Sequence, residues 1–253
     1  MIYICTVHFQ TERWISRQSA FLRRNLDQPY RVVACVPPTR RRRSFHVESN
    51  YEPESQISWN HAQKLNYLAR IVEQEAQPDD ILIFLDGDAF PVRPLAPYLQ
   101  DKLSRHSFIA VKRLENDGDI QPHPSFAATT VRFWQEIEGD WSPGFEWINH
   151  RGQTVTDAGG NLLQTLNNRA TDWHPLLRTN RHNPHPLWFG IYDDVIYHHG
   201  AGYRKPISRL DLNRSGSSLE DYGETAEFRA MVRLQNRVFR RMRFDARFYD
   251  SFL

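Results

Sequence analysis

Two aspartates lie one residue apart at the end of an apolar run, in the segment ILIFLDGDAFPV of residues 81–92. Asp-Gly pairs are common in turns, because Asp accepts local backbone hydrogen bonds and Gly tolerates positive φ. A ligand site is the alternative, since two like charges this close repel unless a cation or hydrogen-bond donors compensate them. Oxygen ligands of this type suit Mg²⁺ or Mn²⁺. Asp86 and Asp88 are therefore candidate metal ligands as well as candidate turn residues.

A second polar segment, HHGAGYRKP at residues 198–206, offers the groups that such a site would need. The imidazole of His199 can supply a nitrogen ligand where Mn²⁺ is used. Lys205 carries a compact positive charge suited to a phosphate, and Gly202 permits close backbone approach. The two segments together favour a metal and phosphate site over a simple acidic turn.

The elements that precede the acidic segment alternate between strands and helices. Apolar runs predict strands, and apolar residues at helical spacing predict helices. The expected order is strand (1–9), helix (11–26), strand (30–36), helix (58–76) and strand (81–86). This β-α-β-α-β order is typical of one half of a doubly wound sheet, where ligands bind beyond the carboxyl ends of the strands. Asp86 and Asp88 fall at that edge.

The later sequence is less regular. Strands are predicted at 106–113, 125–134 and 193–199, and a helix is predicted at 158–169. The sequence shows no internal repeat and no clear linker, so we expect one α/β domain over residues 1–207. Residues 208–253 are predicted to form a basic helical extension that packs on the same domain.

Composition and charge narrow the classes of partner. The chain has 253 residues, with 32 Lys and Arg against 30 Asp and Glu, which gives a net charge of +2. Nucleic-acid binding would call for a strong basic excess, so we do not expect it. The first residues, MIYICTVHF, lack the basic segment of a signal peptide, and no apolar run is long enough to span a bilayer. A cytoplasmic location is expected, with Cys5 and Cys35 as buried free thiols.

The two polar segments resemble the motifs of a known enzyme class. An apolar strand that ends in Asp-x-Asp resembles the metal motif of glycosyltransferases with the GT-A fold. The spacing His-x-x-Gly-x-x-Lys-Pro at residues 199–206 resembles the C-terminal motif of glycosyltransferase family 8, although Ile207 stands where that family often has Trp. The resemblance implies a Rossmann-like mixed sheet flanked by helices. It also implies that Asp86, Asp88 and His199 hold Mn²⁺ or Mg²⁺, and that Lys205 contacts the donor diphosphate.

The resemblance further suggests residues that contact the donor. In GT-A enzymes the end of the first strand cradles the nucleotide base, which makes Thr6, Val7 and His8 candidates. His61 and Lys64 lie one turn apart near the start of the helix that precedes the acidic segment, so they share a face. That face either contacts the sugar or the diphosphate or is simply solvated. Asp86 and Gly202 are donor-site candidates as well.

Two acidic residues are candidates for catalysis. Asp157 precedes a Gly-Gly pair and a predicted helix, so it is either an N-cap or a residue that contacts the donor sugar or acceptor. Glu146 lies in the segment SPGFEW, an aromatic loop that either packs or binds the acceptor. An inverting transfer would need such a carboxylate as a base, whereas in a retaining transfer Asp157 would position the sugar.

The sequence therefore predicts a metal-dependent glycosyltransferase that uses a nucleotide-diphosphate sugar, with UDP favoured and a retaining outcome. A glycan or a lipid-linked molecule is the expected kind of acceptor. One alternative is a phosphatase of the haloacid dehalogenase type, whose Asp-x-Asp also follows an apolar strand but normally the first one. The other is a nucleotide-sugar-binding protein without catalysis.

Two basic segments remain. Residues 40–43, all Arg, are either a solvated loop or a contact for an anionic acceptor or lipid phosphate. The tail EFRAMVRLQNRVFRRMRF is an amphipathic helix that either docks on the chain's own core or lies on a membrane surface. Of these two arrangements, docking on the core is favoured, and peripheral membrane contact is the alternative.

Overall fold

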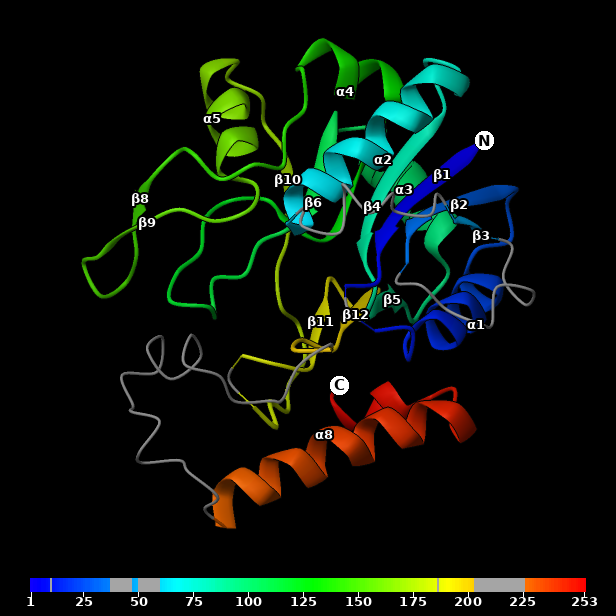
Figure 1. Ribbon diagram of the computed structural model, residues 1–253, viewed down its shortest axis with the longest axis vertical. Coiled ribbons are helices and arrows are strands. Elements are labelled where there is room, and N and C mark those ends of the chain that lie inside the picture. The colour runs from blue at the N-terminus through cyan, green and yellow to red at the C-terminus, as the bar shows by residue number, and fades with distance from the viewer. Residues whose placement is uncertain (10, 37–46, 50–59, 186, 203–225) are drawn as a thin grey trace.

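The computed structural model describes residues 1–9, 11–36, 47–49, 60–185, 187–202 and 226–253. A sheet of seven strands runs through the centre, with helices on both faces (Figure 1). Its strands are β1 (Ile2–Val7), β2 (Tyr30–Cys35), β3 (Val47–Ser49), β4 (Ile81–Asp86), β6 (Phe108–Val111), β7 (His123–Thr130) and β10 (His174–Leu176). Residues 37–46 fall outside the described ranges, and they include the four arginines at 40–43.

The sheet is mixed, with the order β10-β6-β7-β4-β1-β2-β3. Strand β1 pairs in parallel with β2 and β4, β2 with β3, and β6 with β10. Strand β7 is antiparallel to both of its neighbours, β4 and β6. The predicted α/β class with a mixed sheet is confirmed. The 3-2-1-4 order of the first four strands is that of a doubly wound sheet.

Side chains that alternate along the strands pack into two apolar layers, one on each face of the sheet. In β1, Ile2 and Ile4 join the layer that α1 (Ile15–Asn25) and α3 (Leu95–Leu103) cover. Tyr3, Cys5 and Val7 join the opposite layer. The helices over that second layer are α2 (His61–Glu75), α4 (Val131–Glu136) and α5 (Gly160–Asn168). Both cysteines are buried and free, as predicted.

Helix α2 begins at a capping box. The side chain of Asn60 accepts from the Gln63 N–H at 2.9 Å, and the side chain of Gln63 accepts from the Asn60 N–H at 2.9 Å. This reciprocal pair satisfies two of the N–H groups that a helix start leaves open. It places His61 at the first residue of the helix.

One predicted element divides in two. The strand predicted over 125–134 ends at Thr130, where α4 starts, because the Thr130 side chain accepts from the Phe133 N–H at 3.2 Å. Such a cap favours a turn into helix over continuation of the strand.

A smaller antiparallel sheet lies below the carboxyl ends of β1 and β4 (Figure 1). Its strands, in spatial order, are β11 (Gly190–Tyr192), β12 (Ile196–His198) and β5 (Ala89–Pro91). The predicted strand at 193–199 is thus shorter than expected. A hairpin of β8 (Trp147–Ile148) and β9 (Thr154–Val155) extends from the α5 side.

The C-terminal helix α8 (Ala226–Phe244) and the 3₁₀ helix η3 (Phe248–Ser251) pack against this smaller sheet and α1. Val238 and Met242 of α8 share an apolar cluster with Phe21 and Phe90. The Arg17 guanidinium lies 3.5 Å from the ring centre of Phe239. The predicted domain boundary between residues 207 and 208 falls outside the described residues. None of the described helices has both the length and the apolar character needed to span a membrane.

Phe248 is the residue whose removal tests this docking. Its ring is 0% exposed and packs against Phe21 and Tyr197, with centroid distances of 5.8 and 4.9 Å. Phe248→Ala is expected to lower the free energy of unfolding by about 3–5 kcal/mol, through lost burial and the cavity left behind. Phe244→Ala is the matched control, because that ring is 82% exposed and its loss should cost less than about 0.5 kcal/mol. Urea unfolding followed by circular dichroism measures both, and equal costs would contradict the docking described.

Candidate metal centre

The Asp86-Gly87-Asp88 segment is the tight connection between β4 and β5, and it crosses the end of β1. The Gly87 N–H donates to the Val7 carbonyl at 3.2 Å. A Cβ at Gly87 would lie 2.7 Å from both the Val7 carbonyl oxygen and His8 Nδ1, so only glycine fits. The turn is therefore pressed against the first strand, and its two carboxylates emerge at the edge of the sheet.

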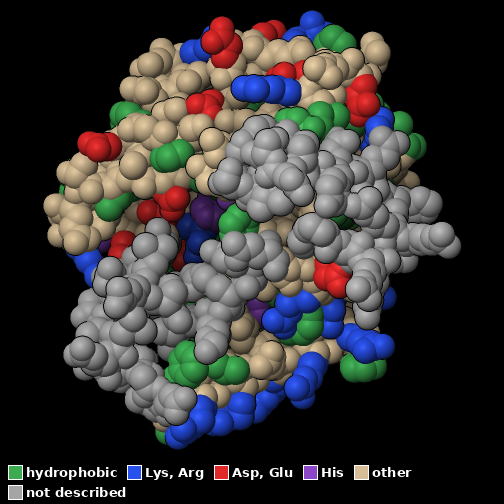
Figure 2. Space-filling model, in the orientation of Figure 1, with side chains coloured by type: hydrophobic (Ala, Val, Ile, Leu, Met, Phe, Trp, Pro, Cys, Tyr) green, Lys and Arg blue, Asp and Glu red, His purple; other side chains and the backbone are tan. Residues whose placement is uncertain are grey.

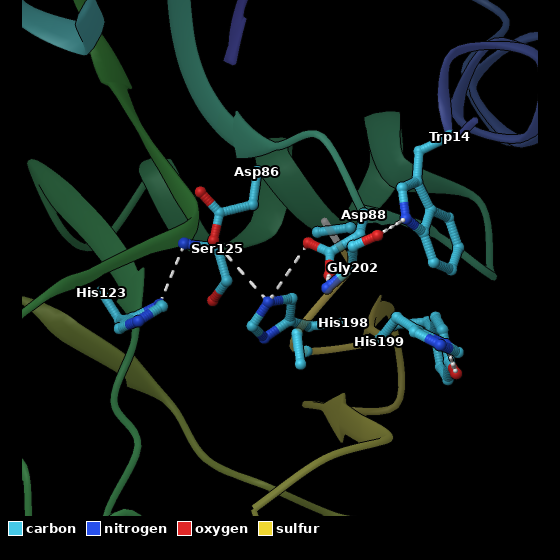
Figure 3. Close-up of polar contacts among 12 residues, drawn as sticks. Trp14, Asp86, Asp88, His123, Ser125, His198, His199 and Gly202 are labelled. Atoms are coloured by element: carbon cyan, nitrogen blue, oxygen red, sulfur yellow. Dashed lines mark hydrogen bonds and ion pairs between the residues drawn. The ribbon is translucent and has the colours of Figure 1, made fainter. Parts of the chain in front are cut away.

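His198 reaches the same point from β12. This strand pairs with β5 so that His198 lies opposite Ala89. His198 Nε2 is 3.4 Å from Asp88 Oδ1 and 3.6 Å from Asp86 Oδ2 (Figure 3). Asp86, Asp88 and His198 each offer a ligand atom, and these three atoms all lie within 4.8 Å of one another.

The orientation of Asp88 is set by its neighbours. Its Oδ2 accepts from the Gly202 N–H at 3.1 Å, and the Gly202 carbonyl accepts from the Trp14 indole Nε1 at 2.8 Å. A Cβ at Gly202 would lie 2.5 Å from Asp88 Oδ2, so glycine is required there too. Burial raises the pKa of Asp88, but the charge and hydrogen bond of His198, together with His199 and a backbone hydrogen bond, outweigh burial and lower that pKa to about 2. Asp88 is thus ionised at neutral pH.

Asp86 has a second imidazole beside it. His61, at the start of α2, places Nε2 at 3.0 Å from Asp86 Oδ1. Burial tends to lower the pKa of His61, but the Asp86 carboxylate outweighs that effect and the pKa lies above its usual value. His61 was predicted as a donor-site residue, and the structure gives it this additional contact with a candidate metal ligand.

His199, the predicted third metal ligand, lies elsewhere. Its ring is 1% exposed and packs 4.5 Å from the Trp14 ring, and its Nδ1 lies 3.0 Å from the Tyr197 hydroxyl. Burial lowers the pKa of His199 to about 3. Successive side chains of a strand point to opposite faces, so Tyr197 and His199 share one face and His198 takes the other. The structure thus differs from the sequence prediction, and His198 joins the two aspartates.

A cavity of about 420 Å³ lies over the cluster. Six of the predicted site residues line it: Val7, His8, His61, Asp86, Asp88 and Gly202. Burial lowers the pKa of His8 to about 4, so this imidazole is neutral at pH 7. Lys205, the predicted diphosphate contact, lies outside the described residues.

Two predicted donor residues are absent from the described lining of the cavity. The Thr6 hydroxyl is buried and donates to Gln18 Oε1 at 3.2 Å, behind the acidic turn. Lys64 is 5% exposed, with its amine 5.0 Å from the ring centre of Phe9, a residue that does line the cavity.

The two predicted catalytic carboxylates are also not among the described residues that line the cavity. Asp157 precedes α5, where its Oδ1 accepts from the Ala158 N–H at 2.8 Å, while Gly159 is the N-cap. Glu146 is exposed, next to β8. Asp157 therefore makes a local turn contact, and the predicted N-cap position is taken by Gly159.

Other residues that line the cavity were missed by sequence reasoning. Arg113 and Asn116 follow β6, His123 opens β7, and Trp188 precedes β11. Arg113 is 9% exposed and donates from Nη2 to the Leu187 carbonyl at 2.8 Å. His123 Nδ1 accepts from the Ser125 N–H at 3.1 Å (Figure 3). For Arg113 and Asn116 the available signal was their place at, or just beyond, the carboxyl end of the strand predicted over 106–113.

The donor set of this cluster fits a divalent cation. Two carboxylates from the β4–β5 turn meet one imidazole from β12. Both carboxylates are largely buried, with side-chain exposures of 15% and 12%. Carboxylate oxygens with an imidazole nitrogen suit Mn²⁺, and carboxylate oxygens with water and phosphate suit Mg²⁺. Asp86, Asp88 and His198 are the described residues that could hold such an ion.

No family model and no curated protein matches the sequence. Among solved structures, the catalytic domain of Drosophila β1,4-galactosyltransferase 7 in complex with xylobiose aligns at 12% identity and a TM-score of 0.43, covering 85% of this chain and 77% of that one. The galactosyltransferase LgtC with donor and acceptor sugar analogues aligns at 10% identity and 0.45, covering 91% of this chain and 100% of that one. An active-site mutant of LgtC aligns at 10% identity and 0.48, with the same coverage. TM-scores below 0.5 establish neither a family nor an activity for this chain.

The two adjacent histidines provide a test of the metal centre. His198→Ala should weaken Mn²⁺ binding at least tenfold, because it removes one of three ligands. His199→Phe keeps an aromatic ring in the buried cluster and should leave the Mn²⁺ dissociation constant within about twofold. Electron paramagnetic resonance titration of free Mn²⁺ measures both variants. Loss of binding in the His199 variant alone would restore the assignment predicted from the sequence.

Proposed function

We propose that this chain is a GT-A glycosyltransferase that moves a sugar from a nucleotide-diphosphate sugar to an acceptor hydroxyl, with a bound Mn²⁺ or Mg²⁺. The observation that carries the proposal is the convergence of Asp86, Asp88 and His198 under a cavity of about 420 Å³. A carboxylate pair with an imidazole suits an ion that also binds phosphate oxygens.

The place of the cavity in the fold supports a nucleotide ligand. Strand β2, which α1 connects to β1, lies on one side of β1 in the sheet, and β4 lies on the other side. Helix α1 covers one face of the sheet and α2 the other, so the strand order reverses between β1 and β4. Ligands of open α/β sheets bind at such a switch point, beyond the carboxyl ends of the strands.

The residues around the cavity divide into groups with different tasks. Asp86, Asp88 and His198 hold the ion, which when bound supplies positive charge to the leaving diphosphate. Lys205 is proposed to add a second positive charge, as the motif resemblance implies. Val7 and His8 lie where the base and ribose of the donor are proposed to bind. Neutral His8 can hydrogen bond to a UDP moiety without adding charge.

We further propose a retaining transfer to a glycan or a lipid-linked acceptor. Retention follows from the resemblance of residues 199–206 to the family 8 motif. A retaining enzyme of that kind requires no carboxylate base, and we therefore do not assign Asp157 or Glu146 as a general base. Both remain candidates for contacts with the sugar or the acceptor.

Asp88→Asn tests the proposal. With Mn²⁺ and a panel of nucleotide sugars, the unaltered protein should release a nucleotide diphosphate from its donor, as mass spectrometry can detect. The variant keeps the shape of the side chain but loses its charge, so turnover should fall at least about a hundredfold, or about 3 kcal/mol.

A remote carboxylate provides the control for that variant. Asp193 pairs with His174 at 2.7 Å and accepts from the Tyr98 hydroxyl at 2.9 Å, away from the cavity lining. Asp193→Asn should lower the free energy of unfolding and leave the turnover rate unchanged. Robust release of free phosphate from sugar phosphates would instead favour the phosphatase alternative and overturn the transferase. Donor binding without turnover on any acceptor or water would favour a binding protein.

The outer face of α8 supports a proposal of peripheral contact with an anionic membrane surface. Between Phe228 and Phe244 the helix carries six arginines and no acidic residue. Four of these, Arg229, Arg233, Arg237 and Arg240, are exposed at helical spacing along one side. Figure 2 shows Lys and Arg side chains gathered along the edge where α8 lies. Cations close to an anionic bilayer each contribute about 1 kcal/mol to binding.

Vesicle sedimentation tests this contact. The triple variant Arg233→Glu, Arg237→Glu and Arg240→Glu should bind vesicles of phosphatidylcholine with phosphatidylglycerol at least tenfold more weakly than the unaltered protein. A control with the same change in charge, Arg105→Glu, Arg132→Glu and Arg169→Glu, alters exposed arginines on other elements and should retain binding. Equal losses in the two triple variants would show that only net charge matters and would contradict a role for α8.

A further inference from the structure

Gln18 of α1 is a buried polar residue that the proposed chemistry does not use. Its side-chain amide is 2% exposed and lies directly behind the acidic turn. Nε2 donates to the Asp86 carbonyl at 2.8 Å and to the Ala89 carbonyl at 2.9 Å. On the other side, Oε1 accepts from the Thr6 hydroxyl at 3.2 Å. One amide therefore joins the first residue of the Asp-Gly-Asp segment, and the residue that follows the segment, to β1.

The two carbonyls that Gln18 holds are that of Asp86 itself and that of Ala89, the residue directly after Asp88. Asp86 ends β4 and Ala89 begins β5, so the chain between them carries the two carboxylates. Tying both ends of this short segment to one rigid group limits the separation and direction of the two side chains. Gln18 itself is not among the described residues that line the cavity, so it acts through the backbone and not through ligand contact.

Helix α1 also holds the other side of the site. Trp14 lies one turn before Gln18, and its indole donates to the carbonyl of Gly202, whose own N–H binds Asp88 Oδ2. Trp14, the N-cap of α1, and Gln18, within the helix, thus hold the acidic turn and the loop that orients Asp88. The arrangement of the two aspartates therefore depends on α1 as well as on β4 and β5.

We propose that Gln18 is a positioning residue, which sets the geometry of the Asp86 and Asp88 carboxylates for a divalent cation through the carbonyls of residues 86 and 89. This inference rests on the proposed metal-dependent function. Outer groups that orient metal ligands commonly change metal affinity by about 10- to 100-fold when they are removed. A side chain that served only packing would change stability without this specific loss.

Gln18→Leu removes the amide while keeping a similar volume, and it leaves both carbonyls without their donor. We expect Mn²⁺, added to the protein without any nucleotide, to bind about 10- to 100-fold more weakly in this variant. Electron paramagnetic resonance of free Mn²⁺ gives the dissociation constant independently of turnover. Thermal unfolding and near-ultraviolet circular dichroism verify that the variant is folded.

Asn25 offers a matched control on the same helix. Its Nδ2 donates to the Pro91 carbonyl at 2.8 Å and to the Phe21 carbonyl at 3.1 Å, so it also ties α1 to β5, but beyond the acidic turn. Asn25→Leu therefore removes a comparable pair of bonds. It should lower the unfolding temperature, while its Mn²⁺ dissociation constant stays within about threefold of the unaltered protein.

A second variant covers the case in which Gln18→Leu does not fold. Thr6→Val keeps the shape of a buried side chain and removes the hydroxyl that holds Gln18 Oε1, so Mn²⁺ binding should weaken by about three- to tenfold. The inference is overturned if Gln18→Leu binds Mn²⁺ as the unaltered protein does, or if it and Asn25→Leu weaken binding equally. When Gln18→Leu is unfolded, unchanged binding in Thr6→Val overturns it. These outcomes would contradict the role of Gln18 but not the proposed function. Absence of Mn²⁺ binding in the unaltered protein would contradict both the role of Gln18 and the proposed function.

Discussion

The electrostatic repulsion between Asp86 and Asp88 is the constraint on which the described site depends. Both carboxylates are largely buried, and like charges in such surroundings are unfavourable unless cations or donors compensate them. The chain supplies imidazoles from His61 and His198 and an N–H from Gly202. These groups come from separate elements, so the pair of aspartates requires the fold around it to be complete.

That requirement explains why the second sheet and the C-terminal helix matter to the site. Strand β12 carries His198 to the aspartates because it pairs with β5, which continues directly from the acidic turn. The cluster around Phe90, Tyr197 and Phe248 packs behind these two strands. From α8, Gln235 donates to the carbonyls of Gly200 and Ala201, at 3.5 and 3.4 Å, next to the loop that orients Asp88. The C-terminal helix therefore supports the wall of the cavity from outside.

The cavity combines the charged carboxylates with neutral polar groups. The carboxylates can attract a divalent cation, and the cation in turn can attract a diphosphate. His8 and the buried His199 have pKa values of about 4 and 3, so they are neutral at pH 7 and add no competing charge. Arg113, which follows β6, also lines the cavity. The described site thus combines candidate ligands for a cation with a neutral imidazole and a guanidinium.

By itself, the sequence determined the order of elements up to β4, apart from the short strand β3, which it did not predict. It also determined the position of both aspartates at a strand end. These features could be predicted because the spacing of apolar residues in strands and helices, and the end of an apolar run, are properties of residues close together in the sequence. The choice of His198 over His199 was decided by tertiary structure. Adjacent residues of a strand face opposite ways, and only the pairing of β12 with β5 determines which one faces the aspartates. The contacts of Gln18 were also decided by tertiary structure. The packing of α1 against the sheet brings the Gln18 amide to the Thr6 hydroxyl and to the backbone of the acidic turn. No spacing along the chain specifies these contacts.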